Sequence, residues 1–374
     1  MIYFDNSATT KIRPEVADFI HEYSINHFFN PSSVYGYAVK VKNDILDGKQ
    51  RMIKLLQGNQ NDNIIFTGSA TEANNLALIG SSRKNKKILI SKGEHPSVFE
   101  TAKNLVNSGF EVDFIDINKD GTLSIEDLKA KMSAEVGVVS VIHVSNETGA
   151  INDLKQIGKV VKSINKSCIF HSDGVQAWGK IKENLLDWQV DMYTMSAHKI
   201  HGPKGVAALY VKSGINLKPI IFGGGQENGL RSGTENPAGI LGFVLASELM
   251  YADFDKKRKH IDGLKKKLLT LLDESGLKFV LNSSDLALSN IVSISFPMIR
   301  GEVLLHSLEK YDICISTGSA CSSKKIGNRV LNEMKLASEL LLGNIRVSFS
   351  EFNTESEVID FVNAVKKEIS TLIG

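Results

Sequence analysis

The sequence has little cysteine and no long apolar run. Cys168, Cys314 and Cys321 are the three cysteines among 374 residues. Three scattered cysteines are too few for a disulfide framework or a zinc cluster. The sequence lacks any run of about 18 apolar residues, and its opening, MIYFDNSATT, lacks a charged leader followed by an apolar stretch. We therefore expect a cytoplasmic protein without a membrane segment.

Neither sign of charge dominates the chain. Lys and Arg total 44, Asp and Glu total 42, and the formal net charge is +2 at pH 7. Because such a chain has no basic field to recruit nucleic acid, we expect no direct nucleic-acid partner. The basic segment 255–272, DKKRKHIDGLKKKLLTLL, has apolar residues at helical spacing and is typical of a solvated amphipathic helix.

Short apolar runs alternate with amphipathic stretches over the first two-thirds of the chain. Seven of these runs predict strands: NIIFTG, KKILIS, FEVDFID, VGVVSVIHV, CIFHSDG, DMYTMSA and GVAALYV. Helical segments such as 71–82 and 96–109 lie between them. This alternation predicts an α/β fold with a mostly parallel, buried sheet.

A second unit is predicted from the last third of the chain. The strand-like NIVSISF and NIRVSFS follow the basic helix. The closing helix places five apolar residues on one face: Val358, Phe361, Val365, Ile369 and Leu372. We expect a large domain over 13–251 and a smaller α/β domain over 1–12 and 252–374.

Residues 116–127, DINKDGTLSIED, resemble a calcium loop. Four residues stand where such a loop needs them: Asp116, Asn118, Asp120 and Gly121. Asp127 stands where a bidentate glutamate is usual, and the preceding FEVDFI predicts a strand where a helix is required. Ser124 and Asp127 instead predict the start of a helix, so we expect no calcium here.

The segment SAHKIHGPKG places Lys199 between a predicted buried strand and a Gly-Pro turn. A lysine that forms a Schiff base must be neutral part of the time, which calls for burial near positive charge. Asp173 ends another predicted strand, at the sheet edge where α/β proteins bind ligands. A carboxylate there can hold the ring nitrogen of pyridoxal phosphate protonated. Taken singly, a solvated lysine and a helix-capping aspartate remain the alternatives.

A phosphate site and a larger set of motifs accompany these two residues. The amides of Ala70 and Thr71, which open a predicted helix after FTGS, would point at an anion. Nine segments then follow one another along nearly the whole chain: YFDNSATT, NPSS, IIFTGSATEANN, GEHPSV, SNETGAI, HSDGVQAWGK, SAHKIHGPKG, GGGQENGLRSGTEN and STGSACSS. In content and order they resemble the cysteine desulfurases of the NifS/IscS-like group, which belong to the class V aminotransferase family.

The resemblance implies a fold, a cofactor and a reaction. The fold would be that of the pyridoxal-phosphate-dependent transferases of fold type I, with a mostly parallel seven-stranded sheet in the large domain. The cofactor would be pyridoxal 5'-phosphate. The enzyme would convert L-cysteine to L-alanine, keep the sulfur as a persulfide on Cys321 and pass it to an iron–sulfur scaffold or a tRNA-thiolation enzyme. The Gly- and Ser-rich surroundings of Cys321 favour a mobile loop.

The same resemblance implies roles for individual residues. Lys199, Cys321 and His95 would be catalytic. Ten residues would bind the cofactor: Ala70, Thr71, His95, Asn146, Asp173, Gln176, Ser196, His198, Lys199 and Thr234. Among them, Asn146 and Gln176 would bond the ring's phenolic oxygen, and Thr234 would reach the neighbouring subunit's cofactor, which implies a homodimer. Arg346, assisted by Asn30, would bind the substrate carboxylate as a fork. No metal ligand is implied.

Some features depart from the family or leave alternatives open. Val34 and Tyr35 follow NPSS where the family has one residue and then a histidine. The other two cysteines, Cys168 and Cys314, lie in apolar runs and should be buried and inert. An aminotransferase or a selenocysteine lyase of the same fold is an alternative, and the lyase would not need Cys321. A sulfur-carrier or assembly-scaffold protein is another, although it would need neither Lys199 nor Asp173.

Overall fold

The computed structural model describes residues 1–317 and 328–373. Within residues 63–211, seven strands form one sheet in the order β2-β8-β7-β6-β5-β3-β4. Strand β8 runs antiparallel to β2 and β7, and the remaining neighbours pair in parallel. The strands are β2 (Asn63–Thr67), β3 (Lys87–Ser91), β4 (Val112–Ile115), β5 (Val136–Ser140), β6 (Ile169–Asp173), β7 (Met192–Ser196) and β8 (Ala207–Val211). The predicted mostly parallel sheet is confirmed, and each predicted apolar run contributes one strand.

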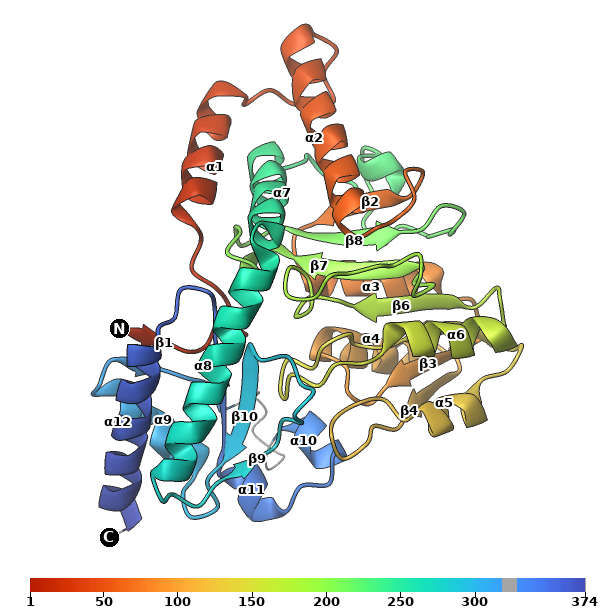
Figure 1. Ribbon diagram of the computed structural model, residues 1–374. Coiled ribbons are helices and arrows are strands. Elements are labelled where there is room, and N and C mark those ends of the chain that lie inside the picture. The colour runs from red at the N-terminus through yellow and green to blue at the C-terminus, as the bar shows by residue number, and fades with distance from the viewer. Residues whose placement is uncertain (318–327, 374) are drawn as a thin grey trace.

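Helices cover both faces of this sheet (Figure 1). Alternation along the strands explains why: Leu89 of β3 packs with one set of helices, whereas Ile88 and Ile90 pack with the other. One face carries α3 (Ala70–Ser81) and α4 (Pro96–Asn107). The other carries α2 (Gly36–Leu55), α5 (Ile125–Lys131), α6 (Leu154–Ile164) and α7 (Pro237–Tyr251), with α1 (Pro14–Asn26) packed against α7.

A second hydrophobic core lies below the sheet in Figure 1. Its strands are β9 (Val280–Leu281), β10 (Ile291–Ser295) and β12 (Asn344–Ser348), which pair antiparallel in the order β12-β10-β9. Strands β1 (Ile2–Tyr3) and β11 (Ile313–Cys314) pair in parallel beside them. Its helices are α8 (Phe254–Glu274), α9 (Gly301–Glu309) and α12 (Glu355–Ile373), whereas α10 (Arg329–Glu333) and α11 (Ser338–Leu342) pack in a small separate cluster. The domain boundaries near residues 13 and 252 stay a prediction.

The closing helix has an apolar face that is buried except at its last residue. In α12, the side chains of Val358, Phe361, Val365 and Ile369 are buried as expected. Leu372 is 46% exposed, because the last turn of the helix extends beyond the second core. Leu372 thus continues the predicted apolar face but is not part of the buried core.

The loop at 116–127 begins a helix as predicted. Ser124 caps α5 by accepting a hydrogen bond from the amide of Asp127 at 3.2 Å. The carboxylate of Asp127 accepts from the amide of Asp116 at 2.7 Å and pairs with Lys131 at 2.8 Å. Among the described residues, no group of three or more His, Cys, Asp or Glu side chains is arranged to hold a metal ion. None of the described helices is long and apolar enough to cross a membrane.

Candidate active site

A cavity of about 570 Å³ opens at the carboxyl ends of β6 and β7, beside the N-terminus of α3. The carboxyl edge is where open α/β sheets bind ligands, because the loops that follow parallel strands meet there. Ten predicted site residues line this cavity: Ala70, Thr71, His95, Asn146, Asp173, Gln176, Ser196, His198, Lys199 and Arg346. Residues that lie far apart in the sequence thus form one site.

Lys199 follows β7 on a short 3-10 turn, Ala197–Lys199. Its ammonium donates hydrogen bonds to the backbone oxygens of Ser7 at 2.5 Å and Ala8 at 2.7 Å. Burial, and then the charge of Arg346, lower the pKa of Lys199 from 10.5 to about 8. A useful fraction of this lysine is therefore a neutral amine near pH 8, which a covalent bond to a carbonyl requires.

Asp173 ends β6 and is only 3% exposed. One carboxylate oxygen accepts from the amide of Val175 at 3.0 Å, and the other accepts from the side chain of Asn74 at 2.8 Å. The same Asn74 amide group donates to Ser97 at 2.8 Å. Asp173 is therefore held in one orientation, with Asn74 as a supporting residue that was not predicted from the sequence.

His95 caps the N-terminus of α4. Its Nδ1 accepts from the amide of Ser97 at 3.1 Å, so in the neutral ring the proton stays on Nε2. Burial lowers the pKa of His95, while the negative charge of Asp173 opposes that change in part. The site therefore contains a neutral imidazole with a fixed tautomer.

The N-terminus of α3 provides an anion-binding element. Ser69 caps the helix by accepting from the amide of Glu72 at 3.2 Å, and helix geometry leaves the amides of Ala70 and Thr71 without intrahelical acceptors. His198 lies across the same cavity and contacts Thr9 at 3.1 Å through Nδ1. Burial, and then the charge of Lys199, lower the pKa of His198 to about 4, so the ring is neutral and can donate one hydrogen bond.

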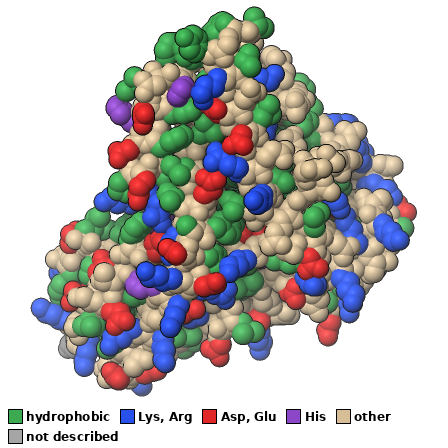
Figure 2. Space-filling view, turned by 45° about the horizontal axis from the view of Figure 1, so that its top comes forward, with side chains coloured by type: hydrophobic (Ala, Val, Ile, Leu, Met, Phe, Trp, Pro, Cys, Tyr) green, Lys and Arg blue, Asp and Glu red, His purple; other side chains and the backbone are tan. Residues whose placement is uncertain are grey.

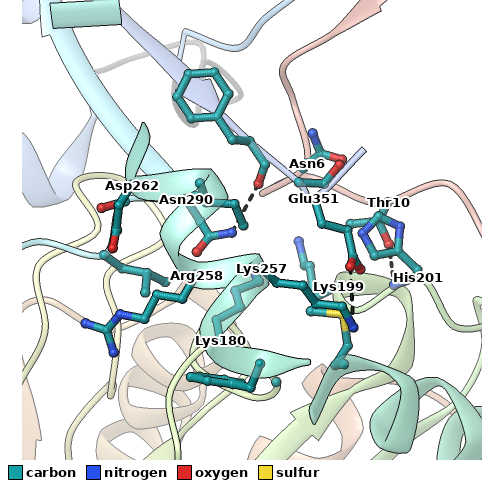
Figure 3. Close-up of a pocket in the computed structure, with 18 of the residues that line it drawn as sticks. Asn6, Thr10, Lys180, Lys199, His201, Lys257, Arg258, Asp262, Asn290 and Glu351 are labelled. Carbon is teal, nitrogen blue, oxygen red and sulfur yellow. Dashed lines mark hydrogen bonds and ion pairs between the residues drawn. The ribbon is translucent and has the colours of Figure 1, made fainter. Parts of the chain in front are cut away.

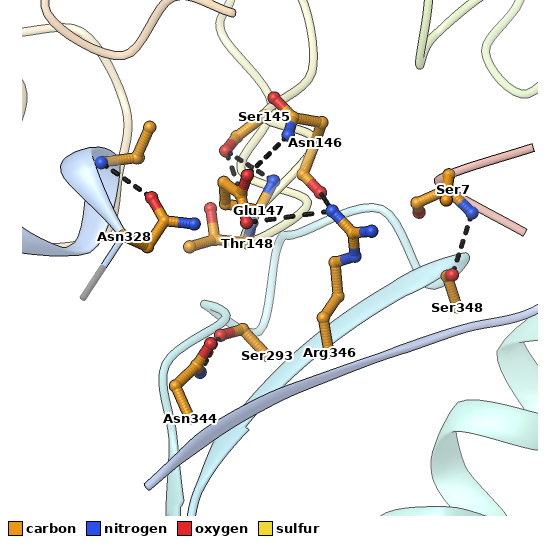
Figure 4. Close-up of polar contacts among 12 residues, drawn as sticks. Ser7, Ser145, Asn146, Glu147, Thr148, Ser293, Asn328, Asn344, Arg346 and Ser348 are labelled. Carbon is orange, nitrogen blue, oxygen red and sulfur yellow. Dashed lines mark hydrogen bonds and ion pairs between the residues drawn. The ribbon is translucent and has the colours of Figure 1, made fainter. Parts of the chain in front are cut away.

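Arg346 extends from β12 toward the loop at 145–148 (Figure 4). It is 6% exposed and donates to the backbone oxygen of Asn146 at 2.8 Å and to Asp5 at 3.1 Å. Glu147 lies 3.7 Å from the same guanidinium. The Nε of Arg346 is buried and has no hydrogen-bond partner among the described residues. The guanidinium is thus fixed at the cavity with donor capacity to spare.

The comparisons with known proteins agree with this geometry. Residues 2–361 match the family described as aminotransferase class-V. The chain belongs to this aminotransferase family. It is 38% identical over 376 residues to a cysteine desulfurase IscS of Clostridium botulinum (strain Hall), covering 98% of this chain and 94% of that protein. It is 36% identical over 377 residues to a cysteine desulfurase of a Nostoc species, covering 99% of this chain and 92% of the relative.

A solved structure also supports the assignment to fold type I. The chain is similar to a NifS-like protein at a TM-score of 0.93 and 32% identity, with 99% of each chain covered. Class V aminotransferases use pyridoxal phosphate, and the polar groups at the cavity suit that cofactor. They combine a low-pKa lysine, a fixed carboxylate and a helix N-terminus that can bind a phosphate.

Other predicted site residues lie elsewhere. Asn30, in the α1–α2 connection, and Thr234, before α7, are exposed and do not line the cavity of this chain. Cys321 lies outside the described residues. Cys168 is buried as expected, and burial raises the pKa of its thiol to about 12. Cys314 was expected to be buried but is half-buried, because neighbouring side chains of β11 point to opposite faces and Ile313 is the one that packs in the second core.

Several residues of the site were not predicted. Asp5 and Glu147 hold Arg346, and Ser7 accepts from Lys199 through its backbone. Asn146 donates its side-chain amide to Glu147 at 2.7 Å. Asn74 left no distinct signal in the sequence, because Asn75 stands beside it and only the structure shows which of the two is fully buried.

Proposed function

We propose that this chain is a pyridoxal-phosphate-dependent cysteine desulfurase, which converts L-cysteine to L-alanine and passes the sulfur to an acceptor. The observation that carries the proposal is the single cavity that joins Lys199, Asp173, His95 and Arg346. Each of these residues has the protonation tendency or the fixed orientation that its proposed role needs. The relatives named cysteine desulfurase support the same reaction.

Particular residues would hold the cofactor. Lys199 would bond it, Asp173 would hold its ring nitrogen and His95 would lie against its ring. The amides of Ala70 and Thr71 would bind the phosphate, with Ser196 and His198 beside them. Asn146 and Gln176 would face the phenolic oxygen. When bound, the cofactor supplies an electron sink that stabilises negative charge at the substrate Cα.

The protein's own groups would bind the substrate and move its protons. Arg346 would bind the substrate carboxylate, with its unpartnered Nε supplying one of the two donors. Once free of the cofactor, the amine of Lys199 would take the proton from the substrate Cα, because its lowered pKa leaves part of it neutral. The imidazole of His95 would hold a proton on Nε2 facing the cavity.

The sulfur step would belong to Cys321, on the strength of the family resemblance. Its thiolate would attack the substrate sulfur and form an S–S bond. The C–S bond would break, and its electron pair would stay with the carbon fragment, which takes up a proton and leaves as alanine. The protein would retain the sulfur as a persulfide on Cys321.

We also propose the assembly and surroundings of the enzyme. Exposed apolar side chains gather where α1 and α2 meet, among them Phe28 at 74%, Val34 at 94% and Tyr37 at 70% exposure (Figure 2). A patch of this kind supports a homodimer, in which Asn30 and Thr234 would serve the site of the partner subunit. The acceptor would be an iron–sulfur scaffold or a tRNA-thiolation enzyme in the cytoplasm.

A spectroscopic and product assay tests the proposed function. Purified protein is loaded with pyridoxal phosphate, its visible spectrum is recorded, and alanine and sulfide are measured after addition of L-cysteine. We expect a visible band and product release that is lost in Cys321→Ala and retained in Cys314→Ala, the control at a half-buried cysteine outside the cavity. A protein that takes up no cofactor is not this enzyme, and activity that survives Cys321→Ala would favour a lyase.

A further inference from the structure

A second lysine, Lys180, lies beside the proposed cofactor-binding residues. It follows Gln176 by four residues on the turn after β6, and its ammonium donates to Gln176 Oε1 at 3.1 Å. Gln176 Nε2 donates in turn to the backbone oxygen of Ser7 at 2.9 Å. That oxygen also accepts from Lys199 at 2.5 Å. The two lysines are therefore linked through one amide and one carbonyl.

Both lysines also line a smaller cavity of about 60 Å³ on the other side of Lys199 (Figure 3). Lys199 borders this cavity and the larger one. The other charged or titratable side chains at the smaller cavity are His201, Lys257, Arg258, Asp262 and Glu351. Glu351 is already paired with Arg13 and with Lys257. Within the described residues, the amine of Lys180 makes one side-chain hydrogen bond, which it donates to Gln176.

We propose that Lys180 is a positioning residue that fixes the Gln176 amide and thereby sets the proton affinity of the cofactor-bound lysine. The inference rests on the proposed function, in which Gln176 faces the phenolic oxygen of the cofactor. An amide can turn by 180°, and a donor on Oε1 selects the orientation that keeps Nε2 toward Ser7 and the cavity. Ser7 holds the Nε2 end of the amide and Lys180 holds the Oε1 end, so without Lys180 the amide keeps one of its two fixing contacts and Nε2 is held less firmly toward the cofactor.

Loss of Lys180 should raise the proton affinity of the cofactor-bound lysine, for two reasons that act in the same direction. A donor on the phenolic oxygen stabilises its anionic form, so a less firmly held donor raises the proton affinity of the cofactor-bound lysine beside it. Loss of positive charge at position 180 acts in the same direction. Burial, and then the charge of Lys199, lower the pKa of Lys180 to about 7, and a neutral amine still donates to Gln176. The positioning role therefore persists above neutral pH.

Other groups contribute a constant background to this titration. Burial lowers the pKa of Lys199 most and the charge of Arg346 lowers it further, while three carboxylates raise it: Asp5, Asp173 and Glu147. His95 and His198 also face the cavity, and burial keeps both rings neutral in the relevant range. None of these groups is changed by a substitution at position 180.

The test is the pH midpoint of the visible cofactor band in the loaded protein. In Lys180→Met we expect the midpoint to rise by roughly half a pH unit or more, as the loss of about one hydrogen bond predicts. Lys180→Arg, which keeps a donor, should restore most of the wild-type midpoint. Lys182→Met is the matched control, because that lysine is exposed and pairs with Asp255. Lys180→Leu replaces Lys180→Met should the latter fail to fold.

A double substitution separates positioning from charge. If Lys180 acts through Gln176, Lys180→Met in a Gln176→Leu background adds little to the shift of Gln176→Leu alone. Additive shifts, or a Lys180→Met midpoint equal to that of wild type, would overturn the inference. Absence of any cofactor band in the wild-type protein would instead refute the proposed function on which the inference rests.

Discussion

Replacement of Arg346 by lysine tests the proposed substrate site most directly. The guanidinium is buried, and Asn146 and Asp5 fix its Nη atoms, while Nε is left to donate. Lysine keeps the positive charge that the neighbouring carboxylates of Asp5 and Glu147 need, so Arg346→Lys should still fold. It cannot form two parallel hydrogen bonds to a carboxylate.

The magnitude follows from the lost donor. A hydrogen bond to a charged group contributes about 1.5 to 3 kcal/mol, which corresponds to a roughly 10- to 150-fold weaker interaction. Since the carboxylate is bound in the ground state and in the transition state alike, we expect this factor to appear mainly in KM for L-cysteine, with little change in kcat.

The assay is alanine release over a range of L-cysteine concentrations, with thermal melting as the check on folding. Arg300→Lys is the matched control, because Arg300 is exposed and pairs only weakly with Glu302, at 3.7 Å. A KM for Arg346→Lys within about twofold of wild type would show that this arginine binds no substrate carboxylate, and a large fall in kcat alone would assign it a different role.

Two further predictions concern the lysine and the sheet edge. Because the pKa of Lys199 is lowered to about 8, the neutral fraction of this lysine grows as the pH rises through that value. The rate at which the apoprotein captures added pyridoxal phosphate should therefore increase with pH, with a midpoint near pH 8. A midpoint near 10.5 would mean that the lysine is not buried. In Gly174→Ala the new Cβ would lie 1.9 Å from Cζ of the fully buried Tyr193, so the free energy of unfolding in urea should fall by about 3 kcal/mol. Gly263→Ala, which meets no atom within 4 Å in α8, should not be destabilised, and equal stabilities would refute the steric argument.

The sheet and the position of Lys199 at its edge were predictable because their signals are local. A strand such as β7 is a continuous apolar run, and Lys199 and Asp173 directly follow or end such runs. Strand ends in a parallel sheet meet at one edge, so their approximate neighbourhood followed from the pattern alone. The family resemblance added the proposed roles of residues such as Gln176 and Arg346, which local patterns do not distinguish from ordinary polar residues.

The supporting contacts were not predictable, because they join residues far apart in the sequence. Asp5 and Arg346 are separated by 341 positions, and Lys180 and Ser7 meet through an amide whose orientation depends on both. Surface exposure at element ends also escaped the patterns, as at Leu372 and Cys314. Periodicity identifies the face of a helix or strand that tends to be buried, but it does not show where the neighbouring element stops.

The position of residues 2–13 bears on how the protein is made. This segment pairs with β11 and contacts β12, and its backbone accepts from Lys199 and Gln176. The ribosome synthesises residues 5–10 long before residues 344–348, so residues 5–10 must wait for β12 before the site can close. Nascent chains that stop short of β12 should therefore fold their central sheet without acquiring a functional cofactor site.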